Sequence, residues 1–544
     1  MQIVIDHAPT CIFFKDSTPA KRMPIGTSII FPSDNDWDDY GYKLRAKIAL
    51  KIDETTTIVA DILIGFYEED AKEENGRTRL IQIVRSLKEG VSANLHKFFI
   101  MLPSMQSYRD LASSIKPKAL KKMLINANEL ATLKHFKPTS KIISKASKER
   151  AFNLGFLRDS EVHFALHNAG SIVQGLSKER TVRSATKWQL NFDLGNDLSH
   201  YEIDLNFNHE AELPRRIAVI IGKNGVGKSQ PLNAISRSLL GRETYLRESE
   251  SGDRPQVSRL IAFASTMESI STFPIERRTQ RTWYKRHHIG SVSKQKSGSK
   301  LPETIIRIAQ SDQSIARRSR LSIFNDSLSA IRDHEQLALV RADGGRPIGI
   351  SEIRNGTSIR NLEQQASIDP NKDPVRMVDG KATKLSSGEL SFINFSALAC
   401  ESIENGSLIL LDEPETHLHP NFISEFAALL DRILELTGSS AIIATHSSYF
   451  VREVFKEQVS VIERDQDGRI QVLKPRLRTF GADVGAISRF VFGENSNSSI
   501  SKRVKRKIIN SNKSWENIYD DYKDELSLET LGEIHELILS KESN

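Results

Sequence analysis

The chain has 544 residues, of which 39% are hydrophobic and 27% are charged, and its formal net charge is +7. This length exceeds one hydrophobic core and predicts two or three domains, or one domain with large insertions. Because no apolar run approaches about eighteen residues and residues 1–15 lack the pattern of a secretion signal, we expect a soluble, cytoplasmic protein. The only cysteines, Cys11 and Cys400, predict reduced thiols and no cysteine-built zinc site.

The first 165 residues are expected to combine strands with lysine-rich helices. Apolar and basic side chains alternate over residues 43–50, and a β-branched run follows over residues 55–67, with Asp53 and Glu54 suited to a turn between them. This pattern predicts an antiparallel hairpin with one face in water. Residues 68–79 predict a loop, and a helical, lysine-rich region follows.

Positive charge is concentrated in three segments. Residues 116–150 hold ten basic residues against two acids, residues 277–300 hold eight without any acid, and residues 502–507 form the third cluster. The second segment also contains the aromatic side chains Trp283, Tyr284, His287 and His288. Such clusters are typical of proteins that bind nucleic acid. For each cluster taken alone, an ordinary solvated surface is the competing interpretation.

An apolar run at residues 217–221 leads into a segment that fits the phosphate-loop pattern G-x-x-x-x-G-K-[ST]. Gly225 and Gly227 let the backbone curl so that consecutive N–H groups face a phosphate at a helix N-terminus. Lys228 would meet the β- and γ-phosphates, and Ser229 would supply an oxygen to Mg²⁺. A glycine-rich turn with a solvated lysine is the competing interpretation. The predicted nucleotide-binding residues here are Gly222, Lys223, Asn224, Gly225, Val226, Gly227, Lys228, Ser229 and Gln230.

The segments on either side of this loop also have predictable structure. Two strands, at residues 188–192 and 201–207, are expected around a turn at Gly195, Asn196 and Asp197. Beyond the loop, Pro231 fits the first turn of a helix, where N–H groups have no intrahelical partner.

A large insertion is expected between Ser229 and Leu385, which are separated by far more residues than a βα crossover needs. It contains a strand candidate at residues 259–264, the second basic segment, and helical material over residues 304–342. No sustained heptads occur, which argues against a long coiled coil.

A capping box is predicted where this insertion ends. Ser386 and Glu389 have the S-x-x-E spacing at the start of an apolar helix over residues 390–403. A capped helix N-terminus with free N–H groups is itself a phosphate site. We therefore expect Ser386, Ser387, Gly388 and Glu389 to serve both as the cap and as ligands of the nucleotide.

Two short apolar runs, at residues 408–411 and 441–444, predict buried parallel strands, with a helix over residues 422–434 between them. Strand, helix and strand in alternation are typical of an α/β parallel sheet. The carboxyl ends of such strands are where ligand-binding side chains gather.

The first of these strands ends in Asp412 and Glu413, and the second leads to His446. Asp412 would complete the Mg²⁺ shell opposite Ser229, whereas Glu413, aimed elsewhere, would orient and deprotonate the attacking water. His446 would contact the γ-phosphate. A helix-capping or surface histidine is the competing interpretation for His446.

In chain order, residues 222–229, 385–389, 408–414 and 445–447 resemble the Walker A, signature, Walker B and switch-histidine motifs of ABC-type ATPases. Residues 412–420 look like the non-transporter branch, which includes RecF, Rad50/SMC, the OLD nucleases and the ATPases of bacterial anti-phage systems. The resemblance covers about residues 186–495. It implies that two subunits enclose two ATP molecules, with the signature Ser386 and Gly388 of one subunit reaching the γ-phosphate held by Lys228 of the other.

Within that branch, residues 479–493 and the overall length resemble the PtuA ATPases of Septu and Septu-like retron systems. The resemblance implies an HNH-type, PtuB-like partner nuclease and, in retrons, a reverse transcriptase with an RNA/DNA hybrid. Two features depart from the ABC pattern. No glutamine is firmly placed as the Q-loop residue, for which Gln280 and Gln313 are the candidates, and Gln230 and Pro231 replace the commoner threonine and leucine.

The sequence thus predicts an α/β, ABC-type P-loop ATPase with a mostly parallel core sheet, an antiparallel β subdomain and a large helical insertion. The expected parts are a β-rich and basic helical region (1–185), an N-lobe with Walker A (186–270), the insertion (271–384), a C-lobe (385–500) and a helical tail (501–544). In the tail, Leu528, Leu531, Ile534 and Leu537 predict either a docking helix for a partner or packing on the tail's own domain.

The expected function is that of an ATP-hydrolysing subunit, with ATP and Mg²⁺ as cofactors. We expect a homodimer or higher oligomer that controls a partner nuclease in anti-phage defence. The alternatives are a DNA-repair ATPase of RecF or Rad50 type, and an ATP-dependent scaffold with little hydrolysis.

Overall fold

The computed structural model describes residues 10–19, 23–34, 43–67, 76–85, 90–157, 159–175, 187–194, 200–209, 212–213, 215–266, 269–277, 280–289, 301–416, 418–492, 499–511 and 513–542. Residues 1–481 form one compact unit and residues 482–544 a second one. The predicted turn at Gly195, Asn196 and Asp197 lies outside the described residues. In the part of the chain that is described, no helix has the length and apolar character needed to span a membrane.

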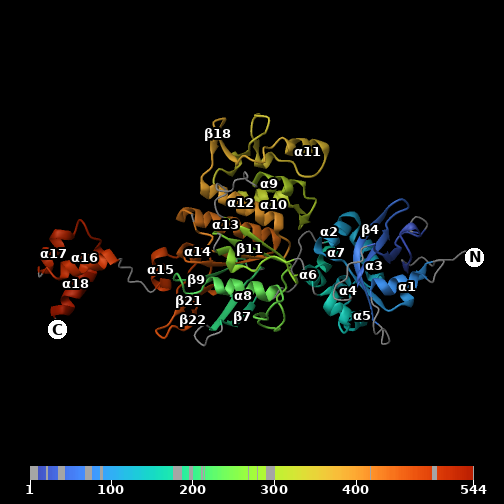
Figure 1. Ribbon diagram of the computed structural model, residues 1–544, viewed down its shortest axis with the longest axis horizontal. Helices are drawn as coiled ribbons and strands as arrows, with labels where there is room; N and C mark the ends of the chain where they lie inside the picture. Colours follow the sequence, from blue (N-terminus) through green and yellow to red (C-terminus); the bar gives the residue numbers. More distant parts are fainter. Residues whose placement is uncertain are drawn as a thin grey trace, which may run out of the picture. The chain divides into compact units, whose positions relative to one another are not determined.

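A seven-stranded sheet in the order β12-β11-β19-β20-β9-β21-β22 forms the core of the first unit (Figure 1). All neighbours are parallel except β21 and β22. The strands are β9 (Ile217–Gly222), β11 (Arg259–Ala264), β12 (Trp283–His288), β19 (Leu408–Asp412), β20 (Ser440–Thr445), β21 (Val459–Arg464) and β22 (Ile470–Leu473). The predicted, mostly parallel sheet is confirmed, and β20 separates the strand before the glycine loop from the strand that ends in Asp412.

Both faces of this sheet are covered, which explains why its inner strands are apolar throughout. On one face pack α8 (Ser229–Leu239) and an antiparallel sheet of β7 (Lys187–Asp193), β8 (His200–Asn206) and β10 (Leu246–Glu248). On the other lie α12 (Ser387–Ser402) and α13 (Pro420–Thr437). There the ring of Phe395 lies 4.7 Å, between centroids, from both Phe263 and Phe426.

The N-terminal part has its own six-stranded sheet, in the order β5-β1-β2-β3-β4-β6. Its strands are β1 (Cys11–Phe13), β2 (Ser28–Pro32), β3 (Arg45–Lys51), β4 (Thr57–Phe66), β5 (Val91–Ser92) and β6 (Phe98–Met101). The predicted hairpin is confirmed, because β3 and β4 pair antiparallel. Beside this sheet are α1 (Arg77–Arg85), α2 (Met105–Ser114), α3 (Pro117–Asn126), α4 (Leu130–Phe136), α5 (Lys141–Ala146), α6 (Ser160–Asn168) and α7 (Gly170–Val173).

Both cysteines are buried and unpaired, as the sequence predicts. Burial raises the pKa of Cys11 and of Cys400 to about 12, so both thiols stay protonated.

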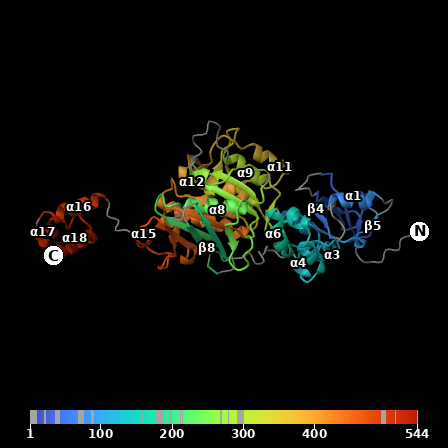
Figure 2. The ribbon, with the colours of Figure 1, turned by 60° about the horizontal axis from the view of Figure 1, so that its bottom comes forward.

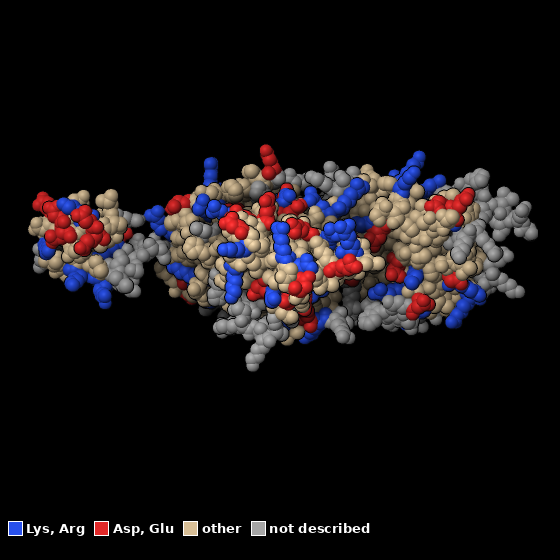
Figure 3. All heavy atoms as spheres, turned by 90° about the horizontal axis from the view of Figure 1, so that it is seen from above, with Lys and Arg blue, Asp and Glu red and all other residues tan. Residues whose placement is uncertain are grey.

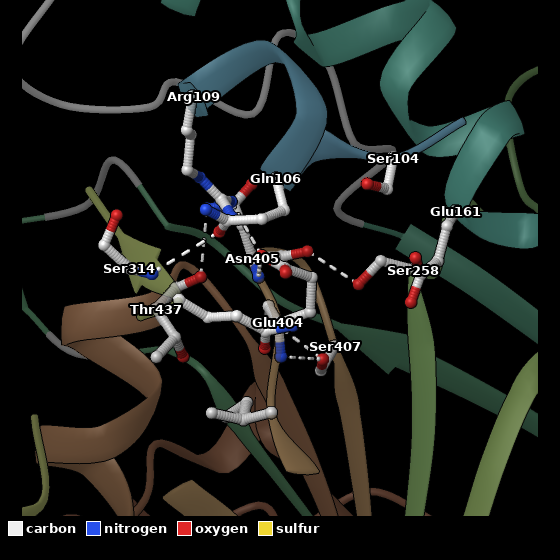
Figure 4. A network of polar contacts seen from close by, with 12 residues as sticks. Ser104, Gln106, Arg109, Glu161, Ser258, Ser314, Glu404, Asn405, Ser407 and Thr437 are labelled. Carbon is white, nitrogen blue, oxygen red and sulfur yellow. Dashed lines mark hydrogen bonds and ion pairs between the residues drawn. The ribbon is translucent and has the colours of Figure 1, made fainter. Parts of the chain in front are cut away.

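A buried ion pair joins the N-terminal part to the core sheet (Figure 4). Nη2 of Arg109, on α2, lies 2.6 Å from Oε1 of Glu404, which precedes β19, and only 7% and 5% of the two side chains are exposed. Burial opposes the ionisation of Glu404, but Arg109 holds the pKa of this carboxyl below its usual value. At the start of α6, Ser160 Oγ donates to the carbonyl oxygen of Ser258, next to β11, at 2.7 Å. Two N-terminal helices, α2 and α6, are therefore fixed to the amino ends of core strands (Figures 1 and 2).

The insertion contains both helices and strands. Its helices are α9 (Leu301–Gln310), α10 (Arg320–Leu328) and α11 (Ile359–Ala366). A four-stranded antiparallel sheet is built from β15 (Leu337–Leu339), β16 (Ile348–Gly349), β17 (Val375–Val378) and β18 (Lys381–Lys384). The helical prediction for residues 304–342 is therefore wrong at β15 and at the short hairpin of β13 (Ser314–Ile315) and β14 (Arg318–Ser319), because runs of two or three residues fit either period until their strand partners are known. The edge strand β12, from the same part of the sequence, belongs to the core sheet.

The second unit contains α15 (Val484–Phe492), α16 (Ser499–Ile509), α17 (Trp515–Tyr522) and α18 (Leu528–Glu542). On the face seen in Figure 3, acidic side chains gather in one patch of its surface, with basic side chains among and around them. Of the four apolar positions predicted for docking, Leu531 and Ile534 are buried inside the unit, whereas Leu528 and Leu537 are exposed. Packing within the unit thus accounts for half of the predicted stripe.

We predict that acid destabilises the fold partly through His287. This ring stacks on Phe263 at 5.2 Å, and burial lowers its pKa to about 4. Below pH 6.5 the unfolded chain gains a proton that the native chain does not, so stability is lost as the pH falls toward 4, by at most about 1.4 kcal/mol per pH unit. His287→Gln should show a smaller drop in the thermal unfolding midpoint between pH 7.5 and 5.5. Exposed His135→Gln is the control, and equal drops in wild type and His287→Gln would contradict the prediction.

Candidate functional site

The glycine loop has the geometry that phosphate binding requires. It connects the buried end of β9 to the start of α8, and Gly225 and Gly227 have φ values of +80° and +95°. A Cβ on Gly227 would lie 2.3 Å from the hydroxyl of Tyr201, so a side chain there is excluded by space as well as by φ. Pro231 sits in the first turn of α8, as expected. A loop of this conformation at a helix N-terminus can present backbone N–H groups to an anion.

Ser229 begins α8, directly after the glycine loop, and Asp412 ends β19. The two residues meet although β9 and β19 are not neighbours in the sheet. Ser229 Oγ donates to Oδ1 of Asp412 at 2.9 Å, and Thr272 Oγ1 donates to Oδ2 at 3.0 Å. Asp412 is 1% exposed, and this burial raises its pKa to about 6. A buried carboxylate beside a hydroxyl is an oxygen donor set that suits a hard divalent cation, so these residues fit Mg²⁺.

Lys228 is buried at the same edge of the sheet and has little to neutralise it. Its Nζ donates to the carbonyl oxygen of Lys223 at 3.1 Å and lies 3.8 Å from Oε1 of Glu413. Only 5% of the Lys228 side chain is exposed. A phosphate placed against the loop would give this ammonium a closer anionic partner than Glu413 does.

Glu413 is held by its backbone while its side chain remains accessible. Its φ is +48°, its N–H donates to the carbonyl oxygen of Ala444 at 2.8 Å, and its own carbonyl oxygen accepts from Ser265 Oγ at 2.5 Å. The side chain is 36% exposed. Glu413 therefore has different neighbours from Asp412, since its carboxyl lies near Lys228 and His446, as expected for neighbouring carboxylates with separate tasks.

His446 lies at the end of β20, between two carboxylates. Its Nδ1 is 3.1 Å from Oε1 of Glu415 and 3.6 Å from Oε1 of Glu413. His446 was identified from the sequence, but Glu415 was not. Glu415 lies within residues 412–420, which the sequence analysis singled out, but that pattern does not indicate where its side chain points. Ser265 and Thr272 were also missed, because only the folded chain brings them to Asp412 and Glu413.

The capping box predicted at α12 is confirmed. Ser386 Oγ accepts from the N–H of Glu389 at 3.3 Å, and Glu389 Oε2 accepts from the N–H of Ser386 at 2.8 Å. Burial opposes the ionisation of Glu389, but hydrogen bonds from Ser386 and the ion pair with Arg376 at 2.6 Å hold its pKa below the usual value. Across the described residues, no hydrogen bond or ion pair links Ser386, Ser387, Gly388 or Glu389 to the glycine loop of the same chain.

The sequence left the Q-loop residue unassigned, and neither candidate glutamine makes a hydrogen bond to Asp412 or Glu413 in the described part of the chain. Gln280 donates to the carbonyl oxygen of Ile275 at 3.3 Å, and Gln313 accepts from Arg320 at 2.8 Å within the insertion. The position after β11, beside Asp412 and Glu413, is held by Ser265. Gln230 is exposed, and its N–H donates to the carbonyl oxygen of Gly227 at 3.1 Å.

The second basic segment is only partly described, and much of its aromatic character is used internally. Tyr284 is 7% exposed and its hydroxyl donates to the carbonyl oxygen of Pro274 at 2.9 Å. Arg259 stacks over the ring of Trp283 at 4.6 Å. These side chains, with His287, hold the edge strand β12 onto the core.

The strand order and these residues give the chain an α/β fold like that of ABC-type ATPases, in which an extra strand separates the strand before the glycine loop from the strand that carries the paired carboxylates. Residues 357–452 match the family model described as "AAA domain, putative AbiEii toxin, Type IV TA system". That stretch includes Ser386, Asp412 and His446. The family match therefore includes these residues but not the glycine loop.

Protein ea59 of Escherichia phage lambda is similar to this chain, with 29% identity over 196 residues. The match covers 36% of this chain, and it spans 37% of the length of the phage protein.

Among solved structures, the chain resembles cbiO1 from Clostridium perfringens, part of the ABC transporter complex cbiONQ, with 15% identity and a TM-score of 0.29 over 61% of this chain and 96% of that one. It also resembles the ADP conformation of MJ1267, an ATP-binding cassette of an ABC transporter, with 12% identity and a TM-score of 0.27 over 56% and 92%. The fold assignment rests on the strand order and the glycine loop, and not on scores this low.

We predict that Lys228→Ala weakens nucleotide binding. Losing one partner of a buried charge pair costs at least ~2 kcal/mol, which corresponds to about a 30-fold rise in Kd. Titration of a fluorescent ATP analogue measures this, with Arg237→Ala on the exposed side of α8 as the matched control. An unchanged Kd in Lys228→Ala would refute the role of Lys228.

Proposed function

We propose that this chain binds Mg²⁺–ATP at the carboxyl edge of its core sheet and hydrolyses it to ADP and phosphate. The observation that carries the proposal is the meeting of Ser229 with Asp412 across β20, beside Lys228 and Glu413. Ser229 and Asp412 would hold Mg²⁺, which supplies charge neutralisation at the β- and γ-phosphates.

The side chains around the γ-phosphate position have separable tasks. Lys228 binds the β- and γ-phosphates, so ATP draws this ammonium from Glu413. Glu413 is then left to orient the attacking water and accept its proton. His446, whose Nδ1 lies 3.6 Å from Oε1 of Glu413, contacts the γ-phosphate.

We further propose that a second copy of the chain completes the site. The 16-residue helix α12 begins with Ser386 as its cap, and its N-terminal N–H groups favour an anion. Since no hydrogen bond or ion pair among the described residues joins this helix start to the glycine loop of its own chain, a partner subunit would bring Ser386, Ser387, Gly388 and Glu389 to the phosphate. Two subunits would then enclose two nucleotides as a homodimer, or within a higher oligomer.

We predict that Glu413→Gln binds ATP but does not turn it over. The amide keeps the shape of the side chain and removes the base, and losing general-base catalysis lowers kcat by on the order of 100-fold or more. Phosphate release measures kcat, and light scattering with ATP tests whether the variant accumulates as a dimer. Equal phosphate release from wild type and Glu413→Gln would refute the base. A variant that stays monomeric at saturating ATP would count against the shared site.

The finer proposal is that the ATPase serves an anti-phage complex of the Septu or retron type, in which nucleotide state controls a bound HNH-type, PtuB-like nuclease. It is supported by the family description, which names a putative AbiEii toxin, by the relative from a bacteriophage, and by the resemblance of residues 479–493 to the PtuA ATPases. A reverse transcriptase with its RNA/DNA hybrid would be a further partner in a retron.

Two other functions remain in competition. A DNA-repair ATPase of RecF or Rad50 type would prefer DNA ends or junctions without partners, and a scaffold would bind ATP with negligible hydrolysis. Purification of the tagged chain from its native host separates them. A co-eluting nuclease supports the defence complex, whereas the chain alone with a preference for DNA ends supports repair.

The basic segment at residues 116–150 is the surface that best suits nucleic acid. It spans α3, α4 and α5, and most of its lysines are exposed. Of its two acids, Glu129 is fully buried and bonded within α4, and Glu149 is half-buried. Lys121 lies 3.9 Å above the ring of Phe136.

In the third basic cluster, by contrast, Lys505 pairs with Glu533 and is less available to a partner. We propose that this α3–α5 face binds the phosphate backbone.

We predict that this binding is strongly salt-dependent. Each phosphate neutralised on a single strand contributes about −0.7 to the slope of log K against log salt, so removing four lysines should flatten the slope by about 3. The test variant changes Lys118, Lys122, Lys137 and Lys141 to Ala, and the control changes Lys372, Lys381, Lys456 and Lys523. Fluorescence anisotropy of labelled oligonucleotides measures the slope. The same slope in both variants would assign the α3–α5 face to ordinary surface.

A further inference from the structure

The carboxyl of Glu415 links the ends of two core strands. It lies just beyond β19, with 5% of its side chain exposed. Its Oε1 accepts a hydrogen bond from Thr445 Oγ1 at 2.5 Å and one from the backbone N–H of His446 at 2.8 Å. The same oxygen lies 3.1 Å from Nδ1 of the His446 ring. A single carboxylate oxygen therefore accepts a hydrogen bond from the backbone of His446 and lies close to its ring.

This contact favours one tautomer of His446. Nδ1 lies 3.1 Å from a carboxylate oxygen that already accepts two hydrogen bonds, so this carboxylate stabilises the ring with its hydrogen on Nδ1. Nε2 is then left for chemistry outside the protein. Within the described residues, Nε2 of His446 has no hydrogen-bond partner.

Glu413 does not provide the same support. Its Oε1 is 3.6 Å from Nδ1, beyond hydrogen-bond length, and its side chain is far more exposed than that of Glu415. It also faces Lys228 at 3.8 Å. Without Glu415, the His446 ring would be free to turn toward Glu413, which is the group proposed to activate water.

The other oxygen of Glu415 indicates that the carboxyl is more than a structural bridge. Oε2 is buried and has no hydrogen-bond partner in the part of the chain that the structure describes, and burial raises the pKa of this carboxyl. A buried oxygen without a hydrogen-bond partner lowers the stability of the fold, and a smaller polar side chain would accept the hydrogen bond from Thr445 without that loss. Buried polar atoms without partners are often found at functional sites.

We infer that Glu415 is a positioning residue for His446: it holds the imidazole with Nδ1 toward the protein and Nε2 toward the γ-phosphate of bound ATP. The inference rests on the proposed function, because it assigns the γ-phosphate to His446. Glu415 itself touches neither the nucleotide nor the water, and it acts through His446.

The test compares Glu415→Ala, Glu415→Gln, His446→Ala and the double variant Glu415→Ala/His446→Ala in steady-state ATP hydrolysis. Loss of an orienting partner lowers kcat by on the order of 10-fold or more, and the KM for ATP should stay within about twofold because the loop is untouched. Glu415→Gln keeps a carbonyl oxygen and should recover part of the loss. The double variant should be no slower than His446→Ala. Full kcat in Glu415→Ala, or losses that multiply in the double variant, would overturn the inference.

A second measurement is independent of activity. Nitrogen-15 NMR of the histidine rings, with His446 assigned by its absence in His446→Ala, reports which nitrogen is protonated. Wild type should carry the proton on Nδ1, and Glu415→Ala should lose that preference. An unchanged pattern in Glu415→Ala contradicts the inference, and if that variant does not fold, Glu415→Met, which fills more of the space but also lacks the oxygen acceptor, is compared in its place.

These results separate the inference from the proposed function. If wild type hydrolyses no ATP, the proposed function fails, and the NMR comparison still decides the role of Glu415. Glu453→Gln is the matched control, since Glu453 accepts a hydrogen bond from Ser424 Oγ at 2.7 Å away from the site. It should keep the kcat and ring signals of wild type.

Discussion

The hydrogen bond from Ser229 to the buried carboxyl of Asp412 is the contact on which the site depends. Parallel strands lie about 4.8 Å apart, so β9 and β19, with β20 between them, are about 10 Å from each other. The glycine loop and the first turn of α8 bridge that gap. The bridge leaves Asp412 nearly without solvent and raises its pKa to about 6, a cost that a bound cation would offset.

The interposed strand β20 also carries the third component of the site. Its end brings His446 beside Glu413, and Glu415 reaches across from β19 to hold it. Three strand ends therefore converge on one edge of the sheet, as expected for parallel strands whose carboxyl ends face the same side. The opposite edge serves a structural purpose, because Arg109 and Ser160 fix the N-terminal helices to the residues before β19 and β11. Strands that hold Asp412 at one end are thus tied to the N-terminal part at the other.

Much of the fold is predictable because its elements have local signals. Buried strands such as β19 and β20 are short apolar runs with polar residues at their ends, and α12 begins with a capping box that local spacing reveals. The prediction failed at β15, where three apolar residues have no period of their own. The Q-loop residue could not be assigned from the sequence; neither Gln280 nor Gln313 makes a described hydrogen bond to Asp412, and Ser265 occupies the place after β11. The sequence around a hydroxyl in a long insertion does not indicate which residue that hydroxyl will contact.

The sequence by itself determined the phosphate loop, the paired carboxylates Asp412 and Glu413, the capped helix and the α/β alternation, because each depends on residues close together in the chain. Only the tertiary structure decided that Thr272 meets Asp412, that Glu415 rather than Glu413 holds His446, and that Arg109 is buried against Glu404. These contacts join residues far apart in sequence or depend on the direction in which a side chain leaves a turn. Local spacing does not encode that direction, and strand order and backbone conformation, such as the positive φ of Glu413, set it.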